Sequence, residues 1–428
     1  MKKVLIITYY WPPAGGPGVQ RWLKFCTYLK EYGIQPIVYI PENPNYPITD
    51  MDIMDEVPKD LIFLKKKIIE PYALASKFGK KDTATISKGV ILEEKMMNWK
   101  QKMLLWVRGN LFIPDARKLW VLPSVNFLKK EIQLRGIDTV ITTGPPHSLH
   151  LIGKRLKEML PITWITDFRD PWTTIGYHSK MRLTSYAAKR HLDLEQQVLQ
   201  ASDHIIVTSQ GTKQEFTQKT QKPITVITNG YEPQKKLQET PLDRSFSIAH
   251  IGSLLSERNP IILWQVISEL LNEYADFRAC FQLTLAGVVS EQVLKSIVHY
   301  QLTPYVRNLG YISHSKALQL QRASQVLLLI EIDSKDTQQI IPGKLFEYLQ
   351  SSRPILAIGP NNSEIQSIIT ETQTGSFFLY SQKKVLKQQL LTYFKQYQQK
   401  SLKVYPNNID QYTRKRLTEK LAALIHSK

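Results

Sequence analysis

Short runs of valine, isoleucine and threonine, separated by helix-like stretches, constrain the fold of this chain more than any other feature. In the first half these runs cover residues 3–10, 34–40, 137–144, 162–168, 203–209 and 224–230. The runs are almost continuously apolar, which is typical of parallel strands that are buried on both faces. Because they alternate with helical stretches, they predict a doubly wound α/β domain.

The same pattern begins again after a polar stretch at 232–244. The second set of strand-like runs covers residues 246–252, 281–289, 306–312, 325–332, 353–359 and 375–380. A chain of 428 residues also exceeds the usual size of one domain. We therefore expect two Rossmann-like domains that face a central cleft, with ligands bound at the carboxyl ends of the strands.

The expected domain boundaries follow from these two sets of strands. The first domain covers residues 1–235 and includes a basic insert around 65–135. The second domain covers residues 245–405. Residues 406–428 are expected to form a C-terminal helix that can cross back to the first domain.

The net charge of +19 is strongly basic. Between Lys65 and Arg135 there are 16 basic and 6 acidic side chains, an excess of 10. Such an excess favours an anionic partner, which could be nucleic acid, an anionic membrane face or a phosphorylated substrate. The alternative is that the lysines only form a solvated surface.

The sequence gives no sign of export. The first apolar run stops at Pro12 and lacks a cleavage site of small residues. No apolar run approaches the roughly 18–20 residues of a membrane-spanning helix. Cys26 and Cys280 are far apart, and we expect both to be free thiols in a reducing cytoplasm. A cytoplasmic location is therefore predicted.

A glycine-rich segment, WPPAGGPGVQRW, follows the first predicted strand and precedes a helix. Gly15, Gly16 and Gly18 lack side chains, so their backbone amides can approach an anionic ligand. Arg21 in the first turn of the helix could add a charge-assisted contact. The spacing is not GxGxxG, and a tight turn without any ligand remains the alternative.

The second domain repeats this arrangement of a strand, a glycine and a cation. Gly252 follows the first strand of the domain, and Arg258 lies six residues further on. Gly343 and Lys344 begin a later helix, where a cation opposes the helix dipole unless an anion shares the site. Glu347 could accept hydrogen bonds from the hydroxyls of a ribose, or it could be a solvated first-turn glutamate.

Two polar motifs follow neighbouring strands of the first domain. In TTGPPHSLH, His147 comes just after a strand. In WITDFRDPW, the residues Asp167, Arg169 and Asp170 come after the next strand. Both motifs are expected to project into the cleft; the alternative is a buried ion pair that braces the loop. No metal-ligand spacing is present, and no metal site is predicted.

Together these motifs resemble the retaining GT-B-fold glycosyltransferases of family 4, of the bacterial polysaccharide type. The resemblance covers nearly the whole chain and rests on four segments, PPAGGPGVQR, VITNGYE, IGSLLSER and KLFEYLQSSRPILAIG. Three positions depart from the family: Ser253 replaces an arginine, Arg258 replaces a lysine, and Gln339 replaces the first of two glutamates. A catalytically degenerate homologue therefore remains an alternative.

The resemblance implies a hexosyltransferase-type enzyme that moves a sugar from a nucleotide diphospho-sugar to an acceptor hydroxyl with retention of configuration. It implies cell-surface polysaccharide or glycolipid synthesis, a saccharide or lipid-linked acceptor, and no cofactor or metal besides the donor substrate. The implied donor-binding residues are Gly15, Gly16, Arg21, Gly252, Ser253, Arg258, Gly343, Lys344 and Glu347. The implied catalytic residues, which position the acceptor or the sugar, are Asp167, Asp170, His147 and Arg169.

The basic insert contains an amphipathic stretch. A single helical face would carry Leu92, Met96, Trp99, Met103 and Trp106. The lysines on its flanks are Lys95, Lys100 and Lys102. This pattern predicts a helix on the anionic inner face of the cytoplasmic membrane, beside a lipid-linked acceptor. The alternative is a stripe that packs into the core of the domain.

Three other functional classes compete with the glycosyltransferase hypothesis. A GT-B-fold epimerase or phosphorylase would need a different carboxylate set or a cofactor lysine, and the sequence shows neither signal. A basic nucleic-acid-binding protein should show a reader module or aromatics interleaved with arginines. The aromatic residues here lie mostly in apolar patterns, so we expect no nucleic-acid partner.

Overall fold

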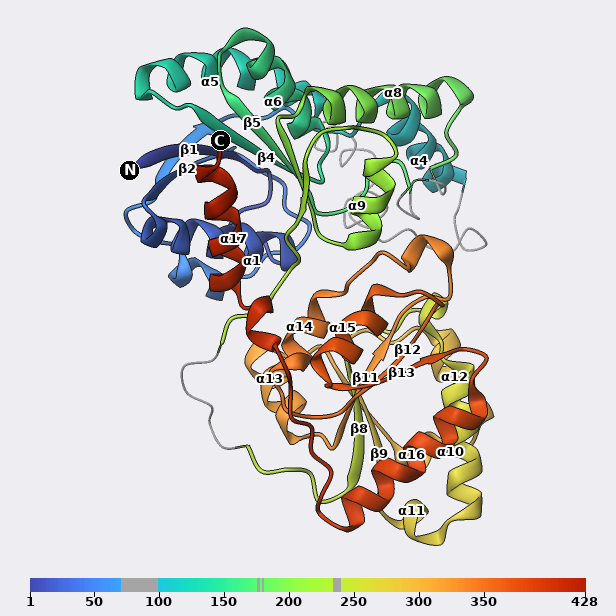
Figure 1. The fold of residues 1–428 in the computed structure, drawn as a ribbon. Helices are drawn as coiled ribbons and strands as arrows, with labels where there is room; N and C mark the ends of the chain where they lie inside the picture. The colour runs from blue at the N-terminus through green and yellow to red at the C-terminus, as the bar shows by residue number, and fades with distance from the viewer. Residues whose placement is uncertain (71–98, 175–177, 179–180, 234–239) are drawn as a thin grey trace. The chain divides into compact units, whose positions relative to one another are not determined.

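The chain divides into two compact units, each built on one parallel sheet (Figure 1). The computed structural model describes residues 1–70, 99–174, 178, 181–233 and 240–428, without the side chains of residues 100, 101 and 104. Unit 1 comprises Met1–Asn229 with Arg414–Lys428, and unit 2 comprises Gly230–Thr413. The prediction of two doubly wound α/β domains is thereby confirmed.

Unit 1 contains a seven-stranded sheet in the order β3-β2-β1-β4-β5-β6-β7. Its strands are β1 (Lys2–Ile7), β2 (Ile34–Pro41), β3 (Ile62–Lys66), β4 (Thr139–Gly144), β5 (Thr163–Phe168), β6 (His204–Val207) and β7 (Ile224–Val226). The chain begins at the centre of the sheet and builds outward in both directions, which is the doubly wound topology. The apolar pattern did not predict β3, because the lysines at 65 and 66 interrupt the apolar run, as is common in edge strands.

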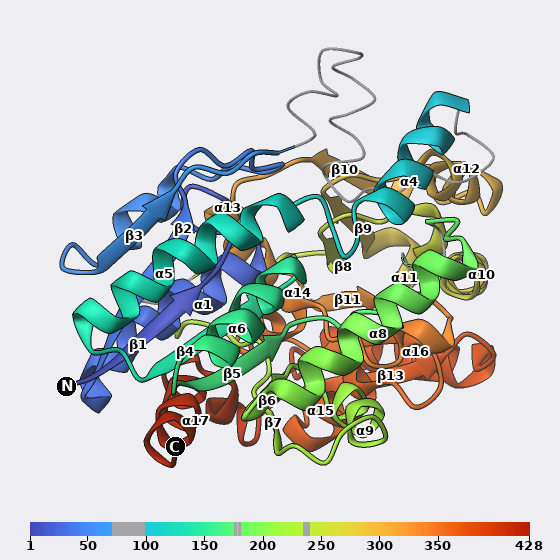
Figure 2. The same cartoon turned by 90° about the horizontal axis from the view of Figure 1, so that it is seen from above.

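Helices cover both faces of this sheet. The helices of unit 1 are α1 (Pro17–Tyr28), α4 (Trp99–Leu111), α5 (Val121–Arg135), α6 (Ser148–Met159), α8 (Ser185–Ala201), α9 (Gln210–Thr217) and α17 (Arg414–His426). Figure 2 looks down on α5, α6 and α8, whose apolar side chains pack on one face of the sheet. The opposite face packs against α1 and α17. Each face therefore has its own hydrophobic core.

The last helix of the chain belongs to unit 1. Leu417 and Leu421 of α17 are buried in the same hydrophobic cluster as Trp22 of α1. Lys2 Nζ donates to the Ile425 carbonyl at 2.9 Å, which ties α17 to the first strand. Both ends of the chain therefore contribute to one core.

Unit 2 contains a six-stranded sheet in the order β10-β9-β8-β11-β12-β13. Its strands are β8 (Phe246–Ile251), β9 (Phe281–Ala286), β10 (Val306–Gly310), β11 (Val326–Ile330), β12 (Ile355–Gly359) and β13 (Gly375–Leu379). Its helices are α10 (Ile261–Glu273), α11 (Ala275–Cys280), α12 (Glu291–His299), α13 (His314–Ala323), α14 (Gly343–Leu349), α15 (Glu364–Thr372) and α16 (Lys383–Gln398). Because β8 and β11 are neighbouring parallel strands at the centre of this sheet, their carboxyl ends lie side by side.

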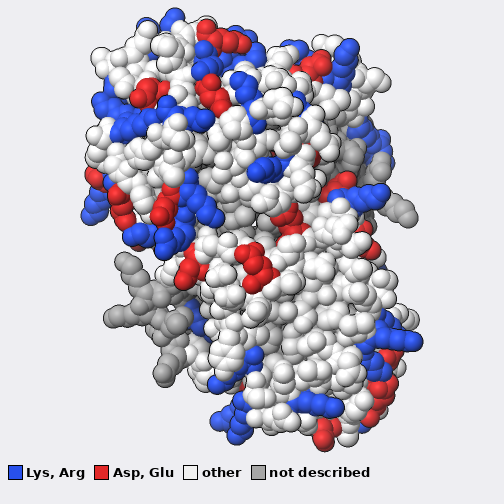
Figure 3. All heavy atoms as spheres, in the orientation of Figure 1, with Lys and Arg blue, Asp and Glu red and all other residues white. Residues whose placement is uncertain are grey.

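The basic excess of the chain belongs almost entirely to unit 1. Unit 2 contains 18 Lys and Arg against 15 Asp and Glu, so 38 and 22 remain for unit 1, a net charge of +16 out of +19. In Figure 3, Lys and Arg side chains are spread over the visible face of unit 1, among some Asp and Glu, whereas charged side chains on unit 2 lie mostly at the edges of the visible face. Within the described residues, no helix is both long enough and apolar enough to cross a membrane.

Candidate functional site

The glycine-rich loop joins β1 to α1 in unit 1. Gly16 is the N-cap of α1, with a φ of 115° that favours glycine, and Pro17 is the first helical residue. The Gly15 amide donates to the Ile48 carbonyl at 3.0 Å, so it is already used within the protein. The Gly16 amide donates to no group among the described residues, and Gly16 is exposed. Of the Gly15 and Gly16 amides, only that of Gly16 is open to a ligand.

Arg21 and Asp167 form a buried ion pair. Arg21 Nη2 lies 2.9 Å from Asp167 Oδ1, and Arg21 Nη1 donates to the Thr228 carbonyl at 2.6 Å. Asp167 Oδ2 accepts from Trp22 Nε1 and from Thr143 Oγ1, both at 2.8 Å. Both charged side chains are almost fully buried. In the structure, the polar atoms of Arg21 and Asp167 hold α1, β4 and β5 together, and the predicted contacts of Arg21 with a diphosphate and of Asp167 with the acceptor stay predictions.

Arg169 fills the space beside the third glycine of the loop. A β-carbon at Gly18 would lie 1.4 Å from Arg169 Nη1, so residue 18 has to be glycine for this side chain to fit. Arg169 Nε donates to the Gly144 carbonyl at 3.3 Å, and Nη2 donates to the Pro145 carbonyl. Gly18 therefore makes room for a side chain of the protein itself, in contrast to the expected approach of a ligand.

Asp170 is the most available of the predicted acidic residues in unit 1. Burial raises the pKa of its carboxyl group, whereas the neighbouring Arg169 lowers it. Its side chain is half-buried and accepts no hydrogen bond from the part of the chain that the structure describes. Asp170 can therefore still accept a hydrogen bond from a ligand hydroxyl.

His147 lies in a buried cluster of aromatic rings at the start of α6. Its ring stacks on Trp172 at 4.8 Å between centroids, and neither ring nitrogen has a hydrogen-bond partner among the described residues. Three further histidines lie in or beside this cluster, namely His150, His178 and His191. Burial lowers the pKa of all four, that of His150 to about 3 and that of His178 to about 4. These imidazoles are therefore neutral near pH 7.

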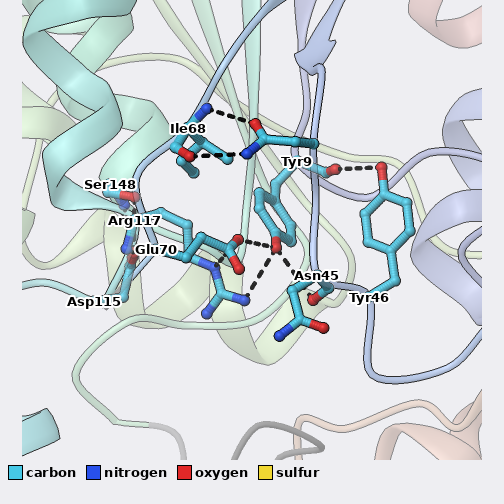
Figure 4. A network of polar contacts seen from close by, with 9 residues as sticks. Tyr9, Asn45, Tyr46, Ile68, Glu70, Asp115, Arg117 and Ser148 are labelled. Carbon is cyan, nitrogen blue, oxygen red and sulfur yellow. Dashed lines mark hydrogen bonds and ion pairs between the residues drawn. The ribbon is translucent and has the colours of Figure 1, made fainter. Parts of the chain in front are cut away.

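A second buried polar network in unit 1 was not predicted from the sequence (Figure 4). Tyr9, just after β1, donates its hydroxyl proton to Glu70, and Arg117 Nη2 donates to the Tyr9 oxygen at 3.2 Å. Asp115 accepts from the backbone amide and the hydroxyl of Ser148, both at 2.8 Å. Because these residues come from segments that share no motif, no sequence signal indicated that they meet.

In unit 2, Lys344 reaches the loop that follows β8. A β-carbon at Gly252 would lie 2.7 Å from Lys344 Nζ, so glycine at 252, with a φ of 123°, lets the ammonium approach the backbone. Lys344 Nζ also lies 3.4 Å from Nε2 of the buried His250. Burial and the nearby Arg258 lower the pKa of Lys344 to about 8, although Glu331 and Glu347 act in the opposite direction.

Arg258 lies at the end of a short helical turn after the same loop, at Ser256–Arg258. Its Nη2 is 3.0 Å from Glu331 Oε1, and its Nε is 3.3 Å from the same atom. The side chain of Glu331 is 1% exposed, and its second oxygen has no partner among the described residues. Glu331 directly follows β11 and was missed, because a single glutamate after an apolar strand carries no motif.

The other unit 2 residues that are predicted to bind the donor lie on the loop after β8 and on α14. Gly343 is the first residue of α14 after the N-cap Pro342. Ser253 is exposed and follows Gly252. Glu347 is half-buried, and its Oε2 accepts from Gln321 at 3.0 Å. Unit 2 therefore brings Gly252, Lys344 and Arg258 together.

The candidate site offers hydrogen-bonding and electrostatic chemistry. In unit 2 the cations are Arg258 and Lys344, and one buried oxygen of Glu331 has no partner among the described residues. In unit 1, Asp170 can accept a hydrogen bond. In the described ranges, no group of three or more His, Cys, Asp or Glu side chains could hold a metal ion. Each unit therefore contributes polar residues near the carboxyl ends of its own strands.

Comparison with known proteins agrees with this architecture. Residues 92–235 match the family model described as Glycosyltransferase Family 4. No curated protein matches the chain. Solved structures do match over nearly the whole length of the chain, and their low sequence identity means that they show the fold alone.

Three of these structures illustrate the range of the fold. A glycosyltransferase from Rickettsia africae ESF-5 is 13% identical with a TM-score of 0.57, covering 99% of this chain and 93% of that one. The lipopolysaccharide outer core galactosyltransferase WaaB is 12% identical with a TM-score of 0.59, covering 100% and 99%. A putative UDP-N-acetylglucosamine 2-epimerase from Listeria monocytogenes is 12% identical with a TM-score of 0.56, covering 100% and 96%.

The fold of the two units and the match to the family model agree with each other. Both units have the parallel sheets of GT-B proteins. The match over residues 92–235, together with this GT-B fold, confirms the resemblance to glycosyltransferase family 4 that the motifs of the sequence indicate.

Proposed function

We propose that this chain transfers a sugar from a nucleotide diphospho-sugar to an acceptor hydroxyl with retention of anomeric configuration. The proposed pathway is the synthesis of a cell-surface polysaccharide or glycolipid, with a hexose as the transferred sugar. The proposed location is the cytoplasm, at the inner face of the cytoplasmic membrane. The proposed reaction needs no cofactor, since the nucleotide diphospho-sugar is itself a substrate.

The observation that carries the proposal is the pair of cations in unit 2. Lys344 and Arg258 lie close enough for Arg258 to lower the pKa of Lys344, while both remain anchored near the carboxyl end of β8. Two neighbouring positive charges attract an anion, and Glu331, which pairs with Arg258, offsets only part of their charge. A diphosphate is an anion of suitable size and charge, and it is the leaving group of the proposed donor.

The proposed chemistry follows from the charge that develops on this leaving group. When the anomeric bond breaks, negative charge builds on the diphosphate, and cations that are already in place stabilise the transition state. Arg258 and Lys344 supply this stabilisation, and Glu347 accepts hydrogen bonds from the ribose. Since the departing phosphate can itself take the proton of the acceptor hydroxyl on the same face, no protein nucleophile is required.

The acceptor side of the proposal uses unit 1. Asp170 has a carboxylate that can accept a hydrogen bond from a sugar hydroxyl. His147 is neutral near pH 7 and has two ring nitrogens without partners among the described residues, one of which is a donor and the other an acceptor. Arg169 holds the loop that carries Asp170. The open amide of Gly16 completes the polar groups that unit 1 offers.

An exposed face of α4 supports the membrane part of the proposal. Trp99, Met103 and Trp106 are 68%, 51% and 41% exposed, whereas Leu105 is 4% exposed. These exposures contradict the alternative that the three residues pack into the core of the domain. Leu92, Lys95, Met96 and the side chain of Lys100 lie outside the described residues. The sequence of α4 contains no acidic residue, and unit 1 carries most of the positive charge. An apolar face within a basic unit fits an anionic lipid surface.

A thermal-shift screen with nucleotide sugars tests the donor part of the proposal. Wild-type protein should be stabilised by one nucleotide sugar of a panel, and Glu347→Ala should lose most of that shift because the ribose contact is gone. Glu291→Ala, an exposed change on α12, should keep it. A shift that survives Glu347→Ala unaltered would contradict the ribose role.

A product assay separates the proposed activity from the epimerase alternative. Incubation of the stabilising donor with candidate saccharide acceptors should give a new glycosidic bond, and NMR of the product should show the anomeric configuration of the donor. Conversion of the donor into its C2 epimer, without any transfer, would support the epimerase alternative.

A further inference from the structure

His250 is a fully buried histidine next to the last residue of β8, and the proposed mechanism does not use it. Its Nδ1 lies 3.1 Å from the Leu328 carbonyl oxygen on the neighbouring strand β11. A carbonyl oxygen can only accept a hydrogen bond, so Nδ1 carries the proton of the neutral ring. Nε2 is therefore left with a lone pair.

That lone pair faces the ammonium of Lys344. Lys344 Nζ lies 3.4 Å from His250 Nε2, at the long end of a hydrogen bond that the lysine donates. Burial and the charges of Lys344 and Arg258 lower the pKa of His250 well below its usual range, although backbone contacts with Leu328 and Ser253 act in the opposite direction. The ring therefore stays neutral beside the cation. The other charged groups that act on Lys344 are Arg258, Glu331 and Glu347.

The two cations of unit 2 are held in different ways. Arg258 is paired with the carboxylate of Glu331, which neutralises part of its charge. Lys344 is held by an uncharged imidazole and by its close approach to Gly252. An uncharged acceptor orients the ammonium without competing with an anionic ligand for its charge. No carboxylate forms an ion pair with Lys344 among the described residues, so its ammonium stays available to an anionic ligand.

We propose that His250 is a positioning residue whose neutral imidazole aims the Lys344 ammonium at the diphosphate of the donor. This role rests on the proposed function, because it assumes that a diphosphate binds beside Lys344. His250 itself touches no part of the donor. Its contribution is to fix one direction for a flexible side chain, which reduces the entropy lost when the ligand binds.

Two substitutions separate this role from a purely structural one. In His250→Gln, the amide oxygen can take the place of Nε2 and accept from Lys344, while the bond to Leu328 is lost. In His250→Asn, the amide group can take the place of Nδ1 and donate to Leu328, while the acceptor for Lys344 is lost. The proposal predicts that Gln rescues ligand binding and that Asn does not.

The experiment is calorimetric titration of the full-length protein with UDP, GDP and ADP in turn. For the nucleotide that binds wild type best, His250→Asn should weaken binding about ten-fold, as expected for loss of a hydrogen bond to a charged group. His250→Gln should stay within about three-fold of wild type. In a Lys344→Met background, His250→Asn should cause no further loss, because the two residues act as one unit.

The pH dependence provides a second readout. Loss of the acceptor disfavours the charged form of Lys344, so the alkaline limit of binding should move to lower pH in His250→Asn. Binding that is as strong in His250→Asn as in wild type, or weaker in His250→Gln than in His250→Asn, would overturn the positioning role.

The outcomes also separate the two proposals. If His250→Asn does not fold, as judged by thermal unfolding, His250→Gln decides alone: near-wild-type binding supports the role, and a ten-fold loss overturns it. If wild type binds none of the three diphosphates, the proposed function fails, and the positioning role fails with it. If wild type binds a nucleoside diphosphate and both His250 variants bind it equally well, the positioning role is contradicted while the proposed function stands.

Discussion

The guanidinium of Arg169 occupies the volume that a β-carbon of residue 18 would fill, with Nη1 only 1.4 Å from the ideal position of that atom. A loop that resembles a ligand-binding glycine turn is thus partly filled by the protein itself. Gly18 and Arg169 are 151 positions apart in the sequence, yet the Arg169 side chain can take its position only because residue 18 has no side chain.

Gly18→Ala is therefore expected to destabilise unit 1. The added methyl group forces the Arg169 side chain away from the Gly144 and Pro145 carbonyls, and overpacking of this kind costs about 1–3 kcal/mol. Urea unfolding measures the loss. In an Arg169→Ala background the same change should cost clearly less; an equal cost in both backgrounds would show that the two residues are independent.

Asp167→Asn should destabilise the protein more strongly than Asp170→Asn. The first change leaves the buried Arg21 without its counter-charge, and breaking a buried ion pair costs about 3–5 kcal/mol. Asp170 has no side-chain hydrogen bond within the described residues, so Asp170→Asn should cost less than about 1 kcal/mol. Asp170→Asn should instead reduce transfer activity. The reverse order of unfolding free energies would argue against the structural assignment of Asp167.

Stability should fall as the pH is lowered from about 6.5 to 4. The pKa of His150 is about 3 and that of His178 about 4 in the folded protein, because both are buried, whereas unfolded histidines titrate near 6.5. Between these values the unfolded state binds protons that the folded state does not, so acid favours unfolding. Each such histidine contributes a slope of about 1.4 kcal/mol per pH unit.

Urea unfolding at a series of pH values checks this dependence. His150→Phe should make the slope shallower, since it removes one of the buried groups. His314→Gln, at an exposed position on α13, should leave the slope as it is in wild type. An unchanged slope in His150→Phe would show that His150 does not contribute.

Trp106→Glu should weaken membrane binding. Trp106 lies on the exposed apolar face of α4, and a carboxylate there would be repelled by anionic lipid and would lose apolar burial. Wild type should sediment with vesicles that contain phosphatidylglycerol and much less with vesicles of phosphatidylcholine alone. Tyr311→Glu, at a 91% exposed position in unit 2, should sediment like wild type. Equal sedimentation of Trp106→Glu and wild type would contradict the role of α4.

The sequence predicted the sheets better than the contacts of the site. Apolar runs such as 246–252 identify buried parallel strands, because burial on both faces leaves a local pattern. The lysine-bearing edge strand β3 has only a weak version of this pattern, and it was missed. Topology then placed Gly252, Arg258 and Lys344 near the carboxyl end of β8, as the predicted order of elements required.

Pairwise contacts were not predictable in the same way. The pairs Arg21–Asp167 and Arg258–Glu331 join residues that are 146 and 73 positions apart, and neither pair forms a recognisable spacing. Charge and glycine content suggested an anion site at Gly15, Arg21 and Gly18. In the folded protein, the Gly15 amide is bonded to the Ile48 carbonyl and Arg21 is paired with Asp167. The space beside Gly18 is filled by Arg169.

Titration calorimetry with UDP, GDP and ADP tests most directly whether Lys344 and Arg258 bind the diphosphate of a sugar donor. For the nucleotide that binds wild type best, Lys344→Met and Arg258→Met should each raise the Kd at least ten-fold, because each loses a charge-assisted contact of about 1.5–3 kcal/mol. Lys295→Met, which removes an exposed positive charge from α12 of the same unit, should leave the Kd within about two-fold of wild type. If Lys344→Met and Arg258→Met bind the nucleotide as tightly as Lys295→Met, the diphosphate does not lie at these two cations.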